Sequence, residues 1–178
     1  TTTGDTVNYE YASIGRLIHS SITSWNAAKQ ENEMDMLTEH LYDRQNRVKE
    51  QSYQIRNSGN IFTTYSQKYT YRGSDGLLTN VESKYSTTDG STDKTLLTYA
   101  LEYDELARLK KRTNSYFTQA YGYRASDSNT TTQIESIVYD KGTAGSEFTK
   151  FTLSYEYDEL GNIETITNSE NPSDNRAY

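Results

Sequence analysis

The sequence has no cysteine, a single proline and only two histidines. Without cysteine the chain has no disulfide bond, no thiolate nucleophile and no cysteine-ligated zinc site. No apolar run approaches the roughly 18 residues of a membrane-spanning helix, so we expect no membrane partner. The lone proline, Pro172, fits a chain that is mostly β-sheet, because proline removes hydrogen bonds from a sheet interior.

Positive charge is also scarce. The chain has 18 Lys and Arg against 25 Asp and Glu, a net charge of −7. Such a chain repels nucleic-acid phosphates and anionic membrane surfaces, so we expect neither as a partner. The sequence begins at Thr1 without an initiating methionine and shows no signal peptide, so we expect a mature or excised fragment.

Aliphatic residues are few, whereas tyrosine is abundant. Ile, Leu, Val and Phe make up about 16% of the chain, and a fraction below roughly 20% with net charge is typical of disorder. The 17 tyrosines and many threonines favour strands instead. Burying a tyrosine removes roughly 150–250 Å² from water, so tyrosine can replace the missing aliphatics if the rings share one face.

One motif recurs along the chain: an aromatic residue, any residue, Tyr, often Asp, two residues, Gly or Asn, a polar residue and an aliphatic one. Its copies read YEYASIGRL, HLYDRQNRV, YTYRGSDGLL, LEYDELARL, YEYDELGNI and the degenerate YGYRASDSN. The second tyrosines of the copies are Tyr11, Tyr42, Tyr71, Tyr103, Tyr123 and Tyr157. The first aromatic position is occupied by Tyr9, Tyr69, Tyr121 and Tyr155 in four copies. The recurrence indicates about six internal repeats.

Each copy is interpreted as a β-hairpin. Apolar residues alternate with polar ones before the motif, which places them on one face of a strand. The aspartates suited to accept backbone N–H groups at the first turn position are Asp43, Asp104 and Asp158. The residues suited to the positive φ of a type I turn with a G1 bulge are Gly15, Asn46 and Gly161. Ala107 at this position predicts strain or a different turn, and Gly76, one residue late, predicts a longer loop.

Second turns are expected between the motifs, around residues 26–32, 56–60, 87–93, 115–116 and 141–146. The predicted fold class is therefore all-β: an antiparallel up-and-down meander of about twelve strands built from these hairpins, forming a curved open strip or partial shell. Residues 1–178 are expected to form a single repeat region, with a flexible tail at 170–178.

Residues 25–41 leave two interpretations open. Good helix formers with Met34, Leu37 and Leu41 at helical spacing favour a short helix. The sequence around Tyr42 is in register with the repeat, which favours strand-turn-strand. We predict strand-turn-strand, with a long loop or one helical turn at 26–33.

No pattern predicts catalysis. His40 replaces the first aromatic residue of a motif and is expected to pack, and His19 is expected to be solvated. The recurring aspartates suit turns better than a glycosidase carboxylate pair, which requires two groups across one cleft. No zinc-hydrolase, nucleophile-elbow or phosphate-loop pattern is present. We therefore predict no catalytic residue, no cofactor and no metal site.

The motif resembles the YD repeats of Rhs, teneurin and wall-associated proteins. YDELGN at 157–162 is the nearest match, followed by YDELAR at 103–108 and IGRL at 14–17. The resemblance covers residues 7–169 and implies a β-meander that spirals into a hollow shell. In the polymorphic toxins of that family such a shell encloses an effector, and in teneurins it belongs to an adhesion module. The sequence departs from the family pattern in lacking a DPxGxxxxxG segment, so we expect shell wall only.

The resemblance implies a non-catalytic structural segment of a large secreted or cell-surface protein, located outside the cell or at the cell wall. Its partners would be neighbouring YD repeats and an enclosed toxin or effector. The alternative is an adhesion module that binds carbohydrate or protein through the tyrosine-rich face of the sheet. Exposed tyrosine rings favour the alternative, and cross-strand packing of those rings favours the structural role.

Overall fold

The computed structural model describes residues 5–58, 61–126, 129–141 and 150–178. These residues form thirteen β-strands and one short 3₁₀ helix, η1, and contain no α-helix. The elements are β1 (Thr6–Tyr11), β2 (Leu17–Asn26), β3 (Glu31–Tyr42), β4 (Val48–Ser58), β5 (Ile61–Tyr71), β6 (Leu78–Thr87), β7 (Asp93–Tyr103), β8 (Leu109–Thr113), β9 (Thr118–Ser126), β10 (Asn129–Asp140), β11 (Lys150–Tyr157), β12 (Ile163–Asn168), η1 (Pro172–Asp174) and β13 (Arg176–Ala177). Strands are hydrogen-bonded in sequence order from β1 to β13. The predicted all-β antiparallel meander is confirmed.

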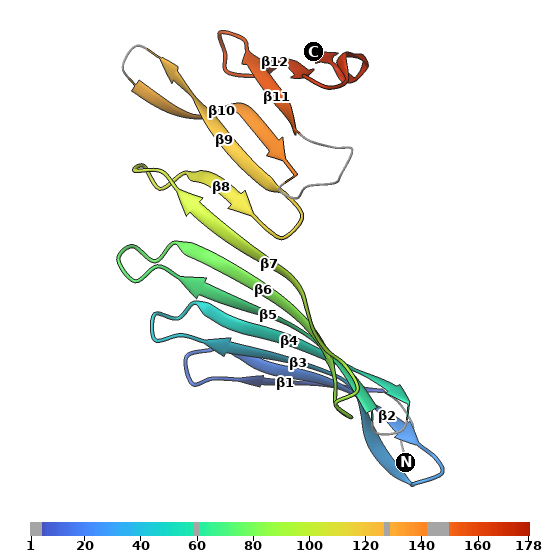
Figure 1. Cartoon of the computed structure of the whole chain (residues 1–178). Helices are drawn as coiled ribbons and strands as arrows, with labels where there is room; N and C mark the ends of the chain where they lie inside the picture. The colour runs from blue at the N-terminus through green and yellow to red at the C-terminus, as the bar shows by residue number, and fades with distance from the viewer. Residues whose placement is uncertain (1–4, 59–60, 127–128, 142–149) are drawn as a thin grey trace. The chain divides into compact units, whose positions relative to one another are not determined.

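The chain divides into two compact units, Thr1–Thr98 and Tyr99–Tyr178. The first unit contains β1 to β6 and the start of β7, and the second contains the end of β7 and β8 to β13. In the first unit, the loops that join β1 to β2, β3 to β4 and β5 to β6 lie on the same side (Figure 1). The motif turns of this unit therefore follow one another along one end of its strands. The curvature of the strip stays a prediction.

Residues 25–41 form strand-turn-strand, as predicted. β2 ends at Asn26 and β3 begins at Glu31. The Asn26 side-chain oxygen accepts hydrogen bonds from the backbone N–H groups of Ala28 and Lys29, at 3.0 and 3.2 Å. β3 pairs with both β2 and β4, and this pairing on both edges overrides the local helix propensity.

The other predicted second turns have different outcomes. The turns around 87–93 and 115–116 are confirmed, because they lie between β6 and β7 and between β8 and β9. The turn at 56–60 and the turn at 141–146 fall partly outside the described residues.

The segment 170–178 differs from the expected flexible tail. It contains η1, which begins at Pro172, and β13, which pairs with β12. The Asn175 side-chain oxygen accepts a hydrogen bond from the Asn168 backbone N–H at 2.7 Å. The Asn171 side chain donates to Asp174 at 2.9 Å. These local amide hydrogen bonds hold the segment against β12, and the alternation of apolar residues gave no sign of them.

The described residues form no core of buried hydrophobic side chains. None of the described hydrophobic side chains is fully buried. The buried residues are Thr38, Thr63 and Gln119. Tyrosines pack across strands instead: Tyr53 faces Tyr65, which in turn faces Tyr85, and the last two rings lie 5.3 Å apart. Directly opposed residues share a face, so cross-strand aromatic pairs stabilise the first unit.

Candidate functional site

Four of the motif turns share one backbone geometry. The Asp43 N–H donates to the Arg47 carbonyl at 2.9 Å, and the Asn46 N–H donates to the Asp43 carbonyl at 3.1 Å. The first, fourth and fifth turns repeat this pair of hydrogen bonds. The closing residues have positive φ: Gly15 (78°), Asn46 (73°), Ala107 (61°) and Gly161 (84°). The positive φ predicted for the closing position is present at all four residues, and Ala107 adopts the same conformation as the glycines rather than a different one.

The bulge sets which residue faces the second tyrosine of each motif, which we call the motif tyrosine. The strand register shifts at this tyrosine in five hairpins, so that the tyrosine faces the aliphatic residue that ends the motif. The facing pairs are Tyr11–Leu17, Tyr42–Val48, Tyr71–Leu78, Tyr103–Leu109 and Tyr157–Ile163. The third turn is one residue longer, with Gly76 at φ 77°, as predicted.

The turn aspartates bind their own backbone. Asp43 Oδ1 accepts hydrogen bonds from the N–H groups two and four residues on, at 2.9 and 3.0 Å. Asp104 and Asp158 do the same. The pKa of each carboxyl is lowered: at Asp43 chiefly by the Arg47 N–H, and at Asp158 chiefly by the side-chain amide four residues on. At Asp104 burial raises the pKa, but hydrogen bonds from the arginine four residues on outweigh it.

An arginine follows the positive-φ residue and connects its turn to the next hairpin. Arg47 Nε donates to Asp43 Oδ2 at 2.7 Å, and the guanidinium carbon lies 4.1 Å from the centroid of the Tyr71 ring. Arg108 repeats both contacts, with the turn aspartate at 2.6 Å and with the Tyr123 ring at 4.2 Å. A cation over an aromatic ring contributes about 0.5–2 kcal/mol.

The first turn lacks this aspartate. Ala12 occupies the position, and Arg16 still lies over the Tyr42 ring at 4.5 Å. The Arg16 Nε and Nη1 atoms are buried and have no hydrogen-bond partner. The arginine therefore keeps its contact with the next hairpin without a carboxylate from its own turn.

The motif tyrosine hydroxyl bonds to the preceding hairpin. Four tyrosines donate to backbone carbonyls: Tyr42 to Leu17 (2.9 Å), Tyr71 to Val48 (2.7 Å), Tyr123 to Leu109 (2.8 Å) and Tyr157 to Ile134 (2.7 Å). Each acceptor is the residue that faces the motif tyrosine of the preceding copy. We call this arrangement the inter-hairpin contact: a motif tyrosine, the carbonyl that its hydroxyl reaches and the arginine above its ring.

The degenerate copy around Tyr123 forms no turn directly after its motif tyrosine. β9 continues through Tyr123 to Ser126, and Tyr123 faces Ile134 in β10. The copy nevertheless keeps the inter-hairpin contact, because Tyr123 donates to Leu109 and Arg124 lies 6.0 Å from the ring of Tyr157. The inter-hairpin contact therefore does not require a turn directly after the motif tyrosine.

A groove of about 660 Å³ lies beside the inter-hairpin contact of the second unit. Its lining includes three tyrosines, two cationic side chains and two carboxylates: Tyr103, Tyr121, Tyr123, Arg108, Lys110, Asp104 and Glu105. Aromatic rings beside cationic groups can bind polar ligands that have one flat apolar face.

No protein-family model and no curated protein sequence matches the chain. Solved structures similar to it include TcdB2-TccC3 without its hypervariable C-terminal region, at 15% identity and a TM-score of 0.46 over 94% of this chain. TcdB2-TccC3-TEV follows at 16% identity and 0.40 over 95%. A porin-like protein from Bacteroides uniformis has 15% identity and 0.32 over 94% of this chain and 84% of its own. The chain spans 10% and 11% of the two TcdB2-TccC3 chains. Likeness at this level does not identify a family.

The first aromatic positions of the motifs have a lesser role. The Tyr69 hydroxyl donates to Gln67 in its own strand at 2.9 Å, and Tyr121 lies 3.5 Å from Gln119. Burial raises the pKa of Tyr69 and of Tyr155. Tyr69, Tyr121 and Tyr155 are half-buried on the sheet, whereas Tyr9 on β1 is exposed.

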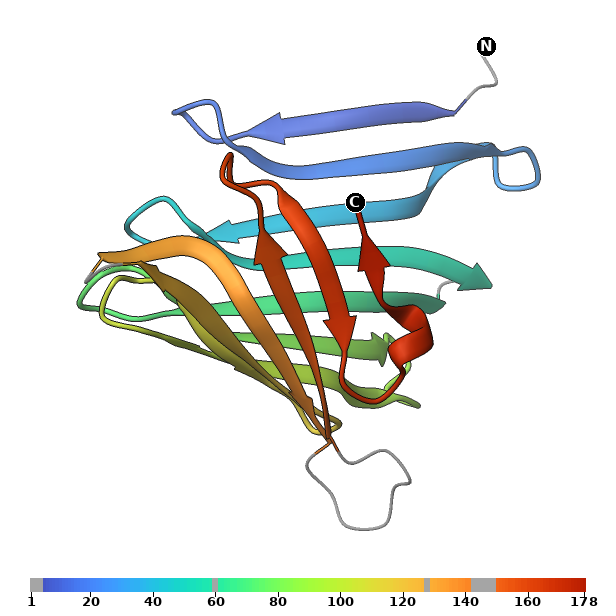
Figure 2. The same cartoon turned by 90° about the horizontal axis from the view of Figure 1, so that it is seen from above.

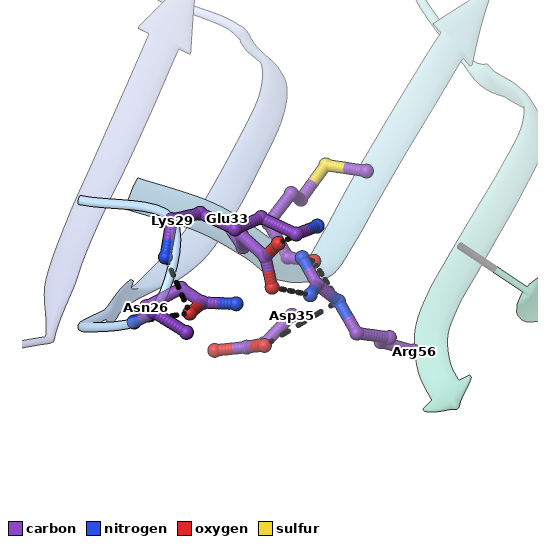
Figure 3. Close-up of polar contacts among 7 residues, drawn as sticks. Asn26, Lys29, Glu33, Asp35 and Arg56 are labelled. Atoms are coloured by element: carbon purple, nitrogen blue, oxygen red, sulfur yellow. Dashed lines mark hydrogen bonds and ion pairs between the residues drawn. The ribbon is translucent and has the colours of Figure 1, made fainter. Parts of the chain in front are cut away.

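A polar cluster beside the turn between β2 and β3 did not emerge from the sequence (Figure 3). Glu33 accepts hydrogen bonds from Lys29 and Arg56, and Arg56 Nε donates to the Met34 carbonyl at 2.8 Å. Asp35 lies 3.6 Å from Arg56. The pKa of Glu33 is lowered to about 2, and the hydrogen bond from Lys29 contributes most to this shift. The cluster ties the end of β4 to the β2–β3 hairpin.

The described residues bring no catalytic constellation together. No three His, Cys, Asp or Glu side chains in this part of the chain are grouped to hold a metal ion. His19 Nε2 lies 3.2 Å from Glu10 on the neighbouring strand. Nor does any helix here have the length and apolar character needed to cross a membrane.

Sequence reasoning named the motif tyrosines and the turn residues but missed the arginine. An Arg follows the positive-φ position in the first, second and fourth copies, and this recurrence was the available signal. The motif pattern described that position only as polar, so the contact with the next tyrosine went unrecognised.

Proposed function

We propose that the chain is a non-catalytic structural segment of a larger secreted or cell-surface protein with YD repeats, and that it forms part of the wall of a shell around a toxin or effector. The observation that carries the proposal is the inter-hairpin contact. Its tyrosine hydroxyl bond recurs at four steps along the chain. A contact that joins each hairpin to its predecessor builds an extended wall rather than a compact globule.

The proposal is tested in the parent protein by protease digestion. Replacing Tyr42, Tyr71, Tyr123 and Tyr157 with phenylalanine removes the hydroxyl bonds and keeps the rings. Digestion of the enclosed polypeptide should accelerate in this variant. The matched control replaces Tyr9, which is 61% exposed, and should digest like the unaltered protein. Equal digestion of the enclosed polypeptide in the quadruple variant, despite a less stable wall, would contradict the proposal.

A second candidate function is the binding of carbohydrate or protein, which the groove of about 660 Å³ favours. Tyr121 is the groove residue best suited to a test, because its hydroxyl has only a 3.5 Å contact with Gln119. A glycan that shifts the NMR signals of Tyr121 and Lys110, and no longer does so after Tyr121→Ala, would support binding. Absence of shifts at millimolar glycan would reject it.

A further inference from the structure

The edge strand β1 carries an incomplete inter-hairpin contact, and the role inferred for this edge rests on the proposed function as a shell wall. Tyr11 occupies the same motif position as Tyr42 and Tyr71. Within the described part of the chain its hydroxyl makes no hydrogen bond, and the residue is 57% exposed where the other two are half-buried. Figure 2 shows β1 at the end of its unit, with β2 on one side.

The hairpin of Tyr71 shows what completes such a contact. The Tyr71 hydroxyl donates to the Val48 carbonyl at 2.7 Å, and its ring lies under Arg47 at 4.1 Å. Arg47 Nη1 also donates to the carbonyl of Gly76 at 3.1 Å. The dipeptide Arg47-Val48, at the exit of the preceding turn, therefore contacts three groups of the Tyr71 hairpin. These groups are the Tyr71 hydroxyl, the face of the Tyr71 ring and the carbonyl of Gly76.

The Tyr11 hairpin presents the same three groups: the Tyr11 hydroxyl, the Tyr11 ring and the carbonyl of Gly15. All six residues of β1 are exposed, including Val7 at 51%. Val7 and Tyr9 face Ile22 and Ser20 of β2, and they lie two residues apart, so they share one face of the strand. An edge strand with unpaired backbone groups is a template for a further strand.

We propose that the edge of β1 binds the return strand of another YD-type hairpin and recognises an Arg–aliphatic dipeptide at the exit of its turn. That arginine lies over the Tyr11 ring and donates to the Gly15 carbonyl, and the aliphatic residue's carbonyl accepts the Tyr11 hydroxyl. The return strand β12 does not match, because it follows Asn162, begins with Ile163 and already pairs with β13. The occupant is therefore an arginine-bearing hairpin and not a second copy docked head to tail.

The test duplicates residues 31–60 in front of Thr1 of the full chain. The duplicated Val48 then lies 23 residues before Tyr11, the separation that Val48 and Tyr71 have in the protein itself. Amide hydrogen exchange of β1, followed by NMR, should slow by about tenfold or more in the fusion. Replacing the duplicated Arg47 with alanine should speed amide exchange of β1 in the fusion by about three- to tenfold. Replacing Tyr11 with phenylalanine should speed it by about the same factor. Tyr9→Phe is the matched control and should leave the slowing intact.

Unchanged exchange of β1 in a fusion whose duplicated strands are themselves protected would overturn the proposal, as would equal slowing with and without the duplicated arginine. Protection of β1 that rises with the concentration of the unmodified chain, together with a dimer in sedimentation, would assign the edge to a second copy and also overturn it. Failure of the proposed function looks different: in the parent protein the enclosed polypeptide would digest equally in the quadruple tyrosine variant and in the unaltered protein, whatever the exchange of β1.

Discussion

Ala107 lies at a backbone conformation that suits glycine, so Ala107→Gly should stabilise the protein. Its φ is 61°, and the equivalent residues Gly15 and Gly161 have φ of 78° and 84°. A left-handed conformation costs an L-residue about 1–2 kcal/mol. Glycine avoids that strain but loses about 0.5–1 kcal/mol more backbone entropy on folding than alanine. The net gain in unfolding free energy should be about 0.5–1 kcal/mol.

The assay is chemical denaturation combined with thermal unfolding, in which a gain of this size raises Tm by about 1–4 °C for a chain of this length. Ala100→Gly is the matched control. Ala100 lies in β7, where it pairs with Thr113 in extended conformation. There glycine has no strain to relieve and should cost about 0.5–1 kcal/mol. The two substitutions remove the same methyl group, so opposite signs isolate the backbone effect.

Gly15→Ala provides the reverse experiment. A Cβ at Gly15 would meet no atom within 4 Å, so its cost of about 1 kcal/mol would come from backbone strain alone. If Ala107→Gly destabilised the protein as Ala100→Gly does, or if Gly15→Ala had no effect, the assignment of these residues to the positive-φ position of the turn would be wrong.

Three further results are expected. Ala12→Asp should raise the unfolding free energy by about 1 kcal/mol, because it supplies a carboxylate to the unpartnered Nε and Nη1 atoms of Arg16; no change in denaturant midpoint would contradict this. Tyr71→Phe should lose about 0.5–1.5 kcal/mol with its hydroxyl bond, whereas Tyr9→Phe should change the midpoint little, and equal losses would argue against the inter-hairpin contact. Because the pKa of Glu33 falls from its usual 4.5 to about 2 on folding, its charged form stabilises the protein fully above pH 4.5 and progressively less as pH falls to 2. Denaturant midpoints of Glu33→Gln should fall less steeply over that range than those of the unaltered protein, and identical pH profiles would refute the assigned hydrogen bonds.

The hairpins were predictable from sequence because their determinants are local. Asp43 accepts a hydrogen bond from the Arg47 N–H, four residues on, and Asn46 supplies the positive φ of the same turn. Strand-turn-strand at 25–41 was also predictable, since the motif around Tyr42 sets the register of β3. The same local reasoning located the strained Ala107 and the longer turn at Gly76.

The contacts that join hairpins were not predictable in the same way. Arg47 reaches Gly76 across 29 residues, and Arg56 reaches Glu33 across 23. Such pairs depend on the register between separate strands, which no single window of sequence specifies. The tyrosine hydroxyl bonds span 14 to 25 residues, so the repeat spacing indicated neighbouring hairpins without naming the acceptor atoms.

Within each unit, the contacts between the described strands join strands that are consecutive in the sequence. Whole hairpins could therefore be inserted or deleted during evolution without redesigning the rest, provided that each new one brings its own tyrosine and arginine. Length would then be an easily varied property of such a protein. For the same reason, a chain pulled from one end should come apart in steps, one hairpin at a time.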